Sequence, residues 1–192
     1  MHPIHVQDVA AAIAWVHGHI GEHGGDIARM ALMGHSAGGH LVSLVSTDQS
    51  YLSVHGLPLT VIKGTVELDA EGLDIPAKMD NDPGNEMIMN AFGDDPLAWA
   101  AASPINHLTT GKGIPPFLAA ARGSAFRQGM ATDFASALEG AGSDATVVDA
   151  SVYTHDEVNS LIGTPGETVI TPPLMAFFAG VFAEKQGHIR YP

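Results

Sequence analysis

Apolar residues recur along the chain at two different spacings. In residues 3–20 they lie at the interval of one helix face, at Val9, Ile13, Val16 and Ile20. Residues 29–34 form a short apolar run flanked by glycines, which favours a buried strand over a helix. Helical spacing returns in residues 36–47. The chain is therefore predicted to open with a helix, a strand and a second helix.

The same alternation continues to the end of the chain. Strands are predicted at residues 61–68, 117–121 and 146–150, with an irregular polar stretch at 71–85. Helices are predicted at 86–92, 96–102 and about 128–138, and a last helix presents one apolar face formed by Leu174, Phe177, Phe178, Val181 and Phe182. This alternation favours an α/β fold with a mainly parallel sheet flanked by helices. We expect one domain over residues 1–192, with a small lid-like insertion at about 70–110.

Composition narrows the function. The 192 residues, 45% of them hydrophobic, suffice for the core of one domain. The net charge of −13 disfavours nucleic acid and anionic membranes as partners. The absence of cysteine excludes disulfides and thiolate chemistry and fits a reducing cytoplasm. With no basic leader and no apolar run of roughly 18 residues, we expect an unprocessed cytoplasmic protein.

The segment Gly34-His35-Ser36-Ala37-Gly38 fits the pattern G-x-S-x-G and lies between a predicted strand and a predicted helix. In that setting a sharp turn exposes the serine hydroxyl, and the glycines let the strand and the helix approach. Ser36 is therefore the candidate nucleophile, and the Ala37 N–H is the candidate oxyanion donor. The competing interpretation is a Gly/Ser-rich turn that only joins two elements.

Four segments in a fixed order carry a family resemblance: residues 8–15, 24–41 around the serine, 99–107 and the region of His155. With them the chain resembles the α/β-hydrolase superfamily, in particular bacterial serine carboxylesterases near the hormone-sensitive-lipase and arylformamidase groups. The resemblance covers nearly the whole chain. It implies hydrolysis of a small ester through an acyl-enzyme on Ser36, without a cofactor.

The resemblance also implies a base and an acid. The base of these enzymes is a histidine after the last strand, a place that His155 takes; an exposed loop histidine is the alternative. Their usual acid follows the strand at 117–121, but Ser124 and Phe126 stand there. Some members supply the acid one strand earlier, which points to Asp69. A turn-forming role for Asp69 remains open, and Asp74 and Asp149 are the other candidate acids.

Several further signals have two interpretations. His19 and His23 have the spacing of a metal pair but lack a zinc motif, so no metal is expected. His35 and His40 flank the serine as structural or lining residues. Arg122 and Arg127 either pair with the acidic excess or meet a substrate carboxylate. The apolar residues of the insertion line an acyl pocket or belong to the core; they are Met79, Met87, Met89, Phe92 and Trp99.

In the superfamily, several strands and a His-Gly-Gly oxyanion loop precede the helix with which this chain opens. We therefore expect an N-terminally truncated domain. Loss of the second oxyanion donor costs roughly 2–4 kcal/mol of transition-state stabilisation in other enzymes. The strand at 29–33 would become an exposed sheet edge, which predicts a homo-oligomer.

Three functions follow from these observations. The first is a serine carboxylesterase. The second is an arylformamidase-type amide hydrolase with the same nucleophile. The third is a catalytically weak, truncated hydrolase that acts as a binding or assembly module.

Overall fold

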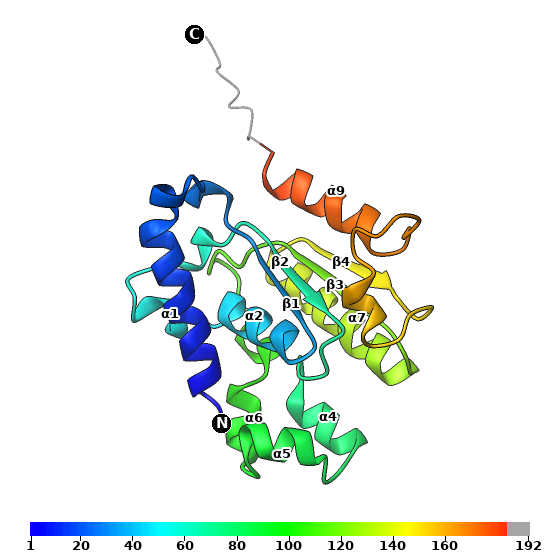
Figure 1. Ribbon diagram of the computed structural model, residues 1–192. Helices are drawn as coiled ribbons and strands as arrows, with labels where there is room; N and C mark the ends of the chain where they lie inside the picture. Colours follow the sequence, from blue (N-terminus) through cyan, green and yellow to red (C-terminus); the bar gives the residue numbers. More distant parts are fainter. Residues whose placement is uncertain (184–192) are drawn as a thin grey trace.

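The computed structural model describes residues 1–183, which build a four-stranded sheet with helices on both faces (Figure 1). The strands are β1 (Leu32–His35), β2 (Thr65–Leu68), β3 (Phe117–Ala121) and β4 (Ala145–Asp149), in the order β1-β2-β3-β4. All three pairings are parallel, as predicted. The carboxyl ends of the strands therefore meet at one edge of the sheet, where α/β proteins place their sites.

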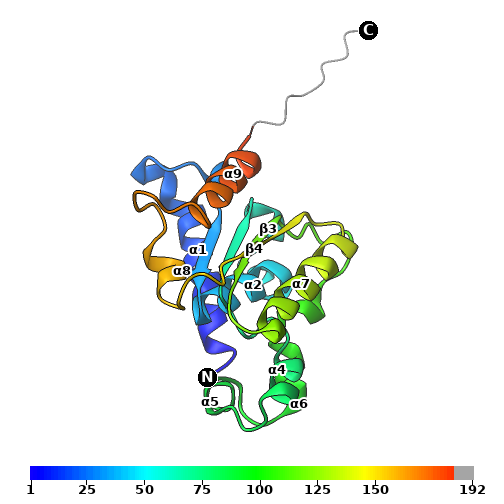
Figure 2. The ribbon, with the colours of Figure 1, turned by 90° about the vertical axis from the view of Figure 1, so that its right-hand side faces the viewer.

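The connections between the strands are helical. Before and after β1 lie α1 (Ile4–His19), α2 (Ala37–Thr47) and α3 (Gln49–Ser53). Between β2 and β3 lie α4 (Ile75–Asn81), α5 (Glu86–Phe92) and α6 (Pro96–Ala101). The rest are α7 (Ala125–Gly140), α8 (Glu157–Ser160) and α9 (Thr171–Val181). Figure 2 shows α2 and α7 on one side of the sheet and α8 and α9 on the other. None of these helices is long and apolar enough to cross a bilayer.

Successive strand residues bury opposite faces of the sheet. Val66 and Leu118 pack with Val158, Ile170 and other residues of the α8–α9 side. Phe117 packs instead against the buried side chains of α7, namely Met130, Phe134 and Leu138. A third cluster joins α1 to α2 and α3. Both faces of the central strands are thus buried, so β2 and β3 have no exposed position; β3 is apolar throughout, whereas β2 also buries Thr65 and Glu67.

Two predicted strands are shorter than expected at their amino-terminal ends. Asp26 accepts a hydrogen bond from the Ala28 N–H and starts a 3-10 turn at Ile27–Arg29, so β1 begins only at Leu32. A similar turn at Leu59–Val61 precedes β2, which begins at Thr65. A short apolar run alone does not show where a turn ends and a strand begins, because it contains too few residues to reveal a period.

The prediction of an irregular stretch at 71–85 is wrong, because it contains α4. Asp74 caps this helix by accepting from the Ala77 N–H, and a proline occupies its first turn. Helix α7 likewise begins at Ala125, three residues before the predicted start, because Ser124 caps it. Short capped helices have too few turns to give a clear apolar period.

The predicted position of the first strand at a sheet edge agrees with the sheet order, since β1 and β4 are the outer strands in the described part of the chain. Met33 in β1 keeps 48% of its surface exposed. The outer side of β1 therefore offers backbone groups and an apolar side chain to the exterior.

Candidate active site

Ser36 stands at the sharp turn between β1 and α2. Its backbone has φ 56° and ψ −122°, a conformation that non-glycine residues rarely adopt. The Ser36 N–H donates to the Leu68 carbonyl at 2.8 Å, which ties the turn to the end of β2. The Ser36 hydroxyl makes no hydrogen bond within residues 1–183 and faces a cavity. This is the strained strand–turn–helix geometry that the G-x-S-x-G pattern predicts.

The two glycines of the pattern have different surroundings. A Cβ on Gly34 would collide with the backbone of Gly38, so only glycine lets β1 and α2 approach this closely. A Cβ on Gly38 would meet nothing within 4 Å. The expectation that both glycines are needed for close packing therefore applies to Gly34 alone.

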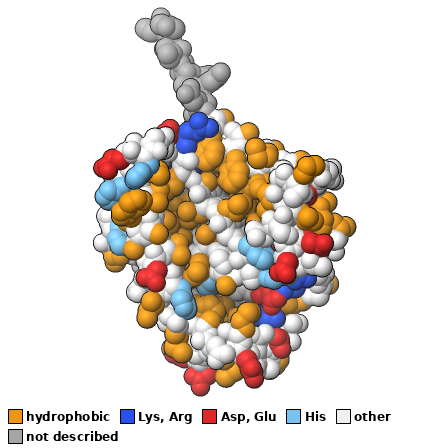
Figure 3. All heavy atoms as spheres, in the orientation of Figure 1, with side chains coloured by type: hydrophobic (Ala, Val, Ile, Leu, Met, Phe, Trp, Pro, Cys, Tyr) orange, Lys and Arg blue, Asp and Glu red, His pale blue; other side chains and the backbone are white. Residues whose placement is uncertain are grey.

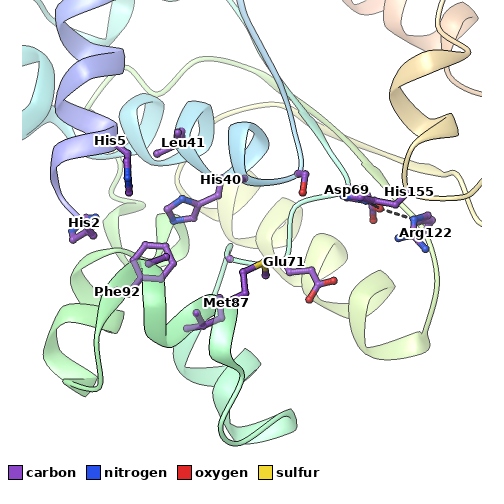
Figure 4. A pocket seen from close by; sticks show the side chains of 15 residues that line it. His2, His5, His40, Leu41, Asp69, Glu71, Met87, Phe92, Arg122 and His155 are labelled. Carbon is purple, nitrogen blue, oxygen red and sulfur yellow. Dashed lines mark hydrogen bonds and ion pairs between the residues drawn. The ribbon is translucent and has the colours of Figure 1, made fainter.

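Asp69 follows β2 directly and is almost fully buried, at 2% exposure. Its N–H donates to the Ala120 carbonyl at 2.7 Å, and its φ of 57° turns the chain out of the sheet. His155 Nδ1 lies 2.6 Å from Asp69 Oδ2 (Figure 4). Because an ionised carboxylate only accepts, this contact places a proton on Nδ1, and in the neutral ring the lone pair is then on Nε2. The structure thus brings together the predicted base and the first of the three candidate acids.

The other two candidate acids are occupied elsewhere. Asp74 caps α4. Asp149 is exposed and accepts from the Ser151 N–H at 2.9 Å and from Gln128 Nε2 at 3.2 Å. The hydrogen bonds from Ser151 hold the pKa of Asp149 below its usual range. Neither carboxylate makes a contact with His155 in the described residues.

His35 supports the loop that carries His155. Its Nε2–H donates to the backbone carbonyl of His155 at 2.8 Å, and the centroids of the two imidazole rings are 4.4 Å apart. His35, which precedes Ser36 in the turn, therefore holds the backbone at His155 and packs against its ring. The prediction of a structural or lining role agrees with this contact.

Two arginines enter the site from the segment where the superfamily resemblance places the acid. Arg122 Nε lies 2.6 Å from Asp69 Oδ2, and Arg127 Nη2 lies 2.5 Å from Oδ1. Arg127 also pairs with Glu71 through Nη1. Phe126 points instead into the apolar cluster beside α7. Pairing with carboxylates, one of the two predicted roles of these arginines, is thus observed; the Asp69 partner was not predicted.

A cavity of about 420 Å³ is lined by the candidate catalytic side chains and by Arg122. Ser36, Ala37, Asp69 and His155 line it at one end, and Met87, Ile88 and Phe92 line its apolar wall. Figure 4 shows His2 and Phe92 at the far end from His155. On the face in Figure 3, acidic and basic side chains lie side by side next to histidine. The volume suits a small molecule with an apolar part.

Other residues of the insertion divide between core and cavity. Met79 is buried with Ile75, Ile88 and Ala102 in a small cluster that Trp99 covers. Met89 is exposed at 40% and lies outside the cavity lining. The insertion therefore has a core of its own and contributes one cavity wall.

Two buried titratable groups lie next to the site. His40 donates from Nε2 to the Ala102 carbonyl at 2.8 Å, and burial lowers its pKa to about 4. Glu67 lies in β2 opposite Gly34, and burial raises its pKa to about 8. In both side chains, burial favours the neutral form. Sequence analysis missed Glu67, although a lone carboxylate in an apolar strand run was a visible signal.

No metal-like group of three or more histidine, aspartate or glutamate side chains occurs within residues 1–183. His19 of the suspected metal pair stacks on Trp15, with ring centroids 4.9 Å apart. The Ala37 N–H at the start of α2 makes no hydrogen bond in the described chain, so it is available to a ligand. The His-Gly-Gly triple at residues 23–25 lies beyond the end of α1 and outside the cavity lining.

Comparison with known families shows which family the chain belongs to. The BD-FAE family model matches residues 1–125, which is more than half of this chain. The chain belongs to the BD-FAE family. Two proteins of Mycobacterium tuberculosis are similar to this BD-FAE chain. Esterase LipQ is 25% identical over 196 residues, 96% of this chain and 46% of LipQ. LipM, named as a probable carboxylic ester hydrolase, is 54% identical over 44 residues, 23% of this chain and 10% of LipM.

Solved structures show the same fold as this BD-FAE chain. A truncated carbohydrate esterase from gut microbiota superimposes with a TM-score of 0.74 at 19% identity, over 94% of this chain and 69% of the other. A thermophilic esterase from Thermogutta terrifontis gives 0.66 at 23% identity, over 95% of this chain and 66% of the other. The expected α/β-hydrolase fold is thereby confirmed. The chain spans less than half the length of the two mycobacterial relatives.

Proposed function

We propose that this chain is a serine hydrolase that cleaves small carboxylic esters through an acyl-enzyme on Ser36. The observation that carries the proposal is the 2.6 Å contact between His155 and Asp69 in the same cavity as Ser36. The candidate nucleophile and acid directly follow β1 and β2, and the candidate base lies on the loop after β4; side chains from distant parts of the chain likewise meet in serine triads on unrelated folds. Membership of the BD-FAE family and the esterase names of its relatives support the same activity.

The reaction divides into two half-reactions. His155 Nε2 takes the proton of the Ser36 hydroxyl as its oxygen attacks the ester carbonyl, and the proton then passes to the leaving alcohol. Water, deprotonated by the same nitrogen, next attacks the acyl-enzyme; the bond from the acyl carbon to Ser36 Oγ breaks, Oγ takes the proton back from Nε2, and the carboxylic acid is released. Asp69 holds the His155 ring in the tautomer with a free Nε2 and stabilises the imidazolium that forms.

The oxyanion is stabilised by the Ala37 N–H at the start of α2, where the backbone donor is unpartnered and the helix dipole is positive. Residues 70–110 act as a lid-like insertion whose apolar wall takes the acyl chain or the alcohol. The small, partly apolar cavity favours small-molecule substrates over polymers.

The test combines active-site labelling with turnover. A fluorophosphonate probe should label the parent at Ser36, and Ser36→Ala should remove both the label and at least 99.9% of the hydrolysis of 4-nitrophenyl butyrate. Ser50→Ala, at an exposed position of α3, serves as the control and should behave as the parent. A folded parent that takes no label favours the alternative of a catalytically weak binding or assembly module. Equal rates for parent and Ser36→Ala would refute the proposal.

We also propose that the exposed edge of β1 pairs with a second copy of the chain. An outer strand with free backbone groups and a half-exposed Met33 is a template for strand pairing. Sedimentation at micromolar concentration should give a dimer or larger assembly. A monomer under these conditions would rule this pairing out.

A further inference from the structure

Arg122 occupies an unusual place in the candidate site. It follows β3 directly and lines the cavity together with Ser36, Asp69 and His155. It is the only lysine or arginine in the lining formed by the described residues. In a chain of net charge −13, this cation in the wall of the cavity that holds Ser36 is a candidate ligand for an anion.

Its contacts leave most of its hydrogen-bonding capacity unused. Nε lies 2.6 Å from Asp69 Oδ2, but the Nε–H is not directed at an acceptor. The two Nη atoms make no hydrogen bond or ion pair with any other residue of 1–183. The side chain is 24% exposed. Arg122 therefore lines the cavity with a planar guanidinium whose two Nη atoms have no partner among the described residues, and such a fork fits a carboxylate.

The carboxylates of Asp69 and Glu71 each have a cationic partner other than Arg122. Arg127, which does not line the cavity, lies 2.5 Å from Asp69 and also pairs with Glu71. Lys78 Nζ lies 2.8 Å from Glu71 and 3.4 Å from the exposed Asp82. Arg122 is thus the member of this network that is available to an incoming anion.

The two ends of the cavity differ in character. Arg122 and His155 lie at one end, whereas Met87 and Phe92 lie towards the other (Figure 4). A ligand that fills this space combines an apolar part with an anionic group close to the reacting serine.

We propose that Arg122 binds a carboxylate of the substrate, so that the preferred substrates are esters that carry an anionic group near the scissile bond. The inference rests on the proposed esterase function and names its substrate class. A desolvated, forked contact between arginine and carboxylate is a charge-assisted interaction, worth about tenfold or more in kcat/KM.

The experiment compares matched esters. 4-Nitrophenyl butyrate is neutral. Mono-4-nitrophenyl succinate replaces the acyl methyl by a carboxylate, and 3-carboxy-4-nitrophenyl butyrate places the carboxylate on the leaving group. The readout is the ratio of kcat/KM for each anionic ester to that for the neutral ester, because a disturbed Asp69 lowers all rates together and leaves the ratio unchanged.

For at least one anionic ester, Arg122→Gln should lower this ratio about tenfold or more, and Arg122→Lys should lower it less. Arg127→Gln removes the other arginine from Asp69 and should keep the parent's ratio within about threefold. Thermal unfolding checks that each variant is folded. The inference is wrong if Arg122→Gln keeps the parent's ratios. It is also wrong if Arg122→Gln and Arg127→Gln change these ratios equally.

Binding separates this inference from the esterase proposal. If the parent hydrolyses none of the three esters, the esterase proposal fails, and calorimetry on Ser36→Ala with 4-phenylbutyrate and neutral 4-phenylbutyramide decides the inference alone. Ser36→Ala should then prefer the acid, and Ser36→Ala/Arg122→Gln should lose about tenfold or more of that preference. No preference, or one that survives the loss of Arg122, would overturn it.

Discussion

Both the backbone conformation and the side-chain contacts of Asp69 restrict which residue can stand at this position. It ends β2, adopts a positive φ of 57°, and gives one carboxylate oxygen each to Arg122 and Arg127, with His155 on the same oxygen as Arg122. Aspartate and asparagine tolerate the left-handed region better than other non-glycine residues do. The position therefore suits a short polar side chain for backbone reasons as well as for chemistry.

Asp69→Asn is expected to keep this backbone and to lose the charge. An amide at this place no longer favours the tautomer with a free Nε2 and does not stabilise the imidazolium, so kcat for 4-nitrophenyl butyrate should fall about 10²–10⁴-fold. Steady-state kinetics measure the loss, and Asp149→Asn is the matched control, expected within twofold of the parent. Equal losses in the two variants would contradict the assignment of the acid.

Sequence reasoning reached Ser36 and His155 because each follows a strand in a recognisable order. Asp69 ranked first because some superfamily members supply the acid one strand earlier and because it lies at a strand end, while Asp74 and Asp149 stayed open. The side-chain distances favour Asp69, and they depend on how β2, β3 and β4 are aligned. The pairing of Asp69 with the two arginines could not be predicted for the same reason, since the partners lie at least 53 positions apart in the chain.

At the scale of elements, the turn between β1 and α2 requires glycine at one position. β1, the turn and α2 depend on Gly34, because the backbone of Gly38 occupies the space that a side chain at 34 would need. The open surroundings of Gly38 come from its place in the first turn of α2. The pattern G-x-S-x-G therefore joins a packing glycine to a glycine with free space around its Cα.

Alanine substitutions should distinguish the packing role of Gly34 from that of Gly38. Gly34→Ala should lower the free energy of unfolding by about 1–3 kcal/mol, because either the strand or the helix must shift. Gly38→Ala should match or exceed the parent, since alanine favours a helix by up to about 1 kcal/mol over glycine. Urea denaturation measures both. Gly38→Ala destabilised as much as Gly34→Ala would contradict this picture.

At the scale of the whole molecule, two buried neutral groups give stability opposite dependences on pH. Burial raises the pKa of Glu67 to about 8 from an ordinary 4.5, so the unfolded chain loses a proton that the folded chain keeps, and stability falls as pH rises through this interval. Burial lowers the pKa of His40 to about 4 from 6.5, so stability is lost as pH falls from 6.5 towards 4. Above pH 6.5 only the Glu67 effect remains.

Glu67→Gln should remove that effect and keep the acceptor for the Ala70 N–H. At up to about 1.4 kcal/mol per pH unit, the gain in unfolding free energy over the parent should be about 2–3 kcal/mol larger at pH 7.5 than at pH 5. Urea denaturation at both pH values measures it, with Glu139→Gln on the exposed side of α7 as the control. A gain independent of pH would show that Glu67 does not keep its proton in the folded chain.

The side chain of Phe126 takes up the place where the superfamily resemblance puts an acid. It packs against the apolar cluster of α7, and Arg127, the next residue, contacts Asp69. A carboxylate substituted at 126 would lose these apolar contacts and would meet a histidine whose Nδ1 already contacts Asp69. The combination Phe126→Asp with Asp69→Asn therefore needs a moved loop as well as two exchanged side chains, and we expect it to leave the enzyme no more active than Asp69→Asn alone.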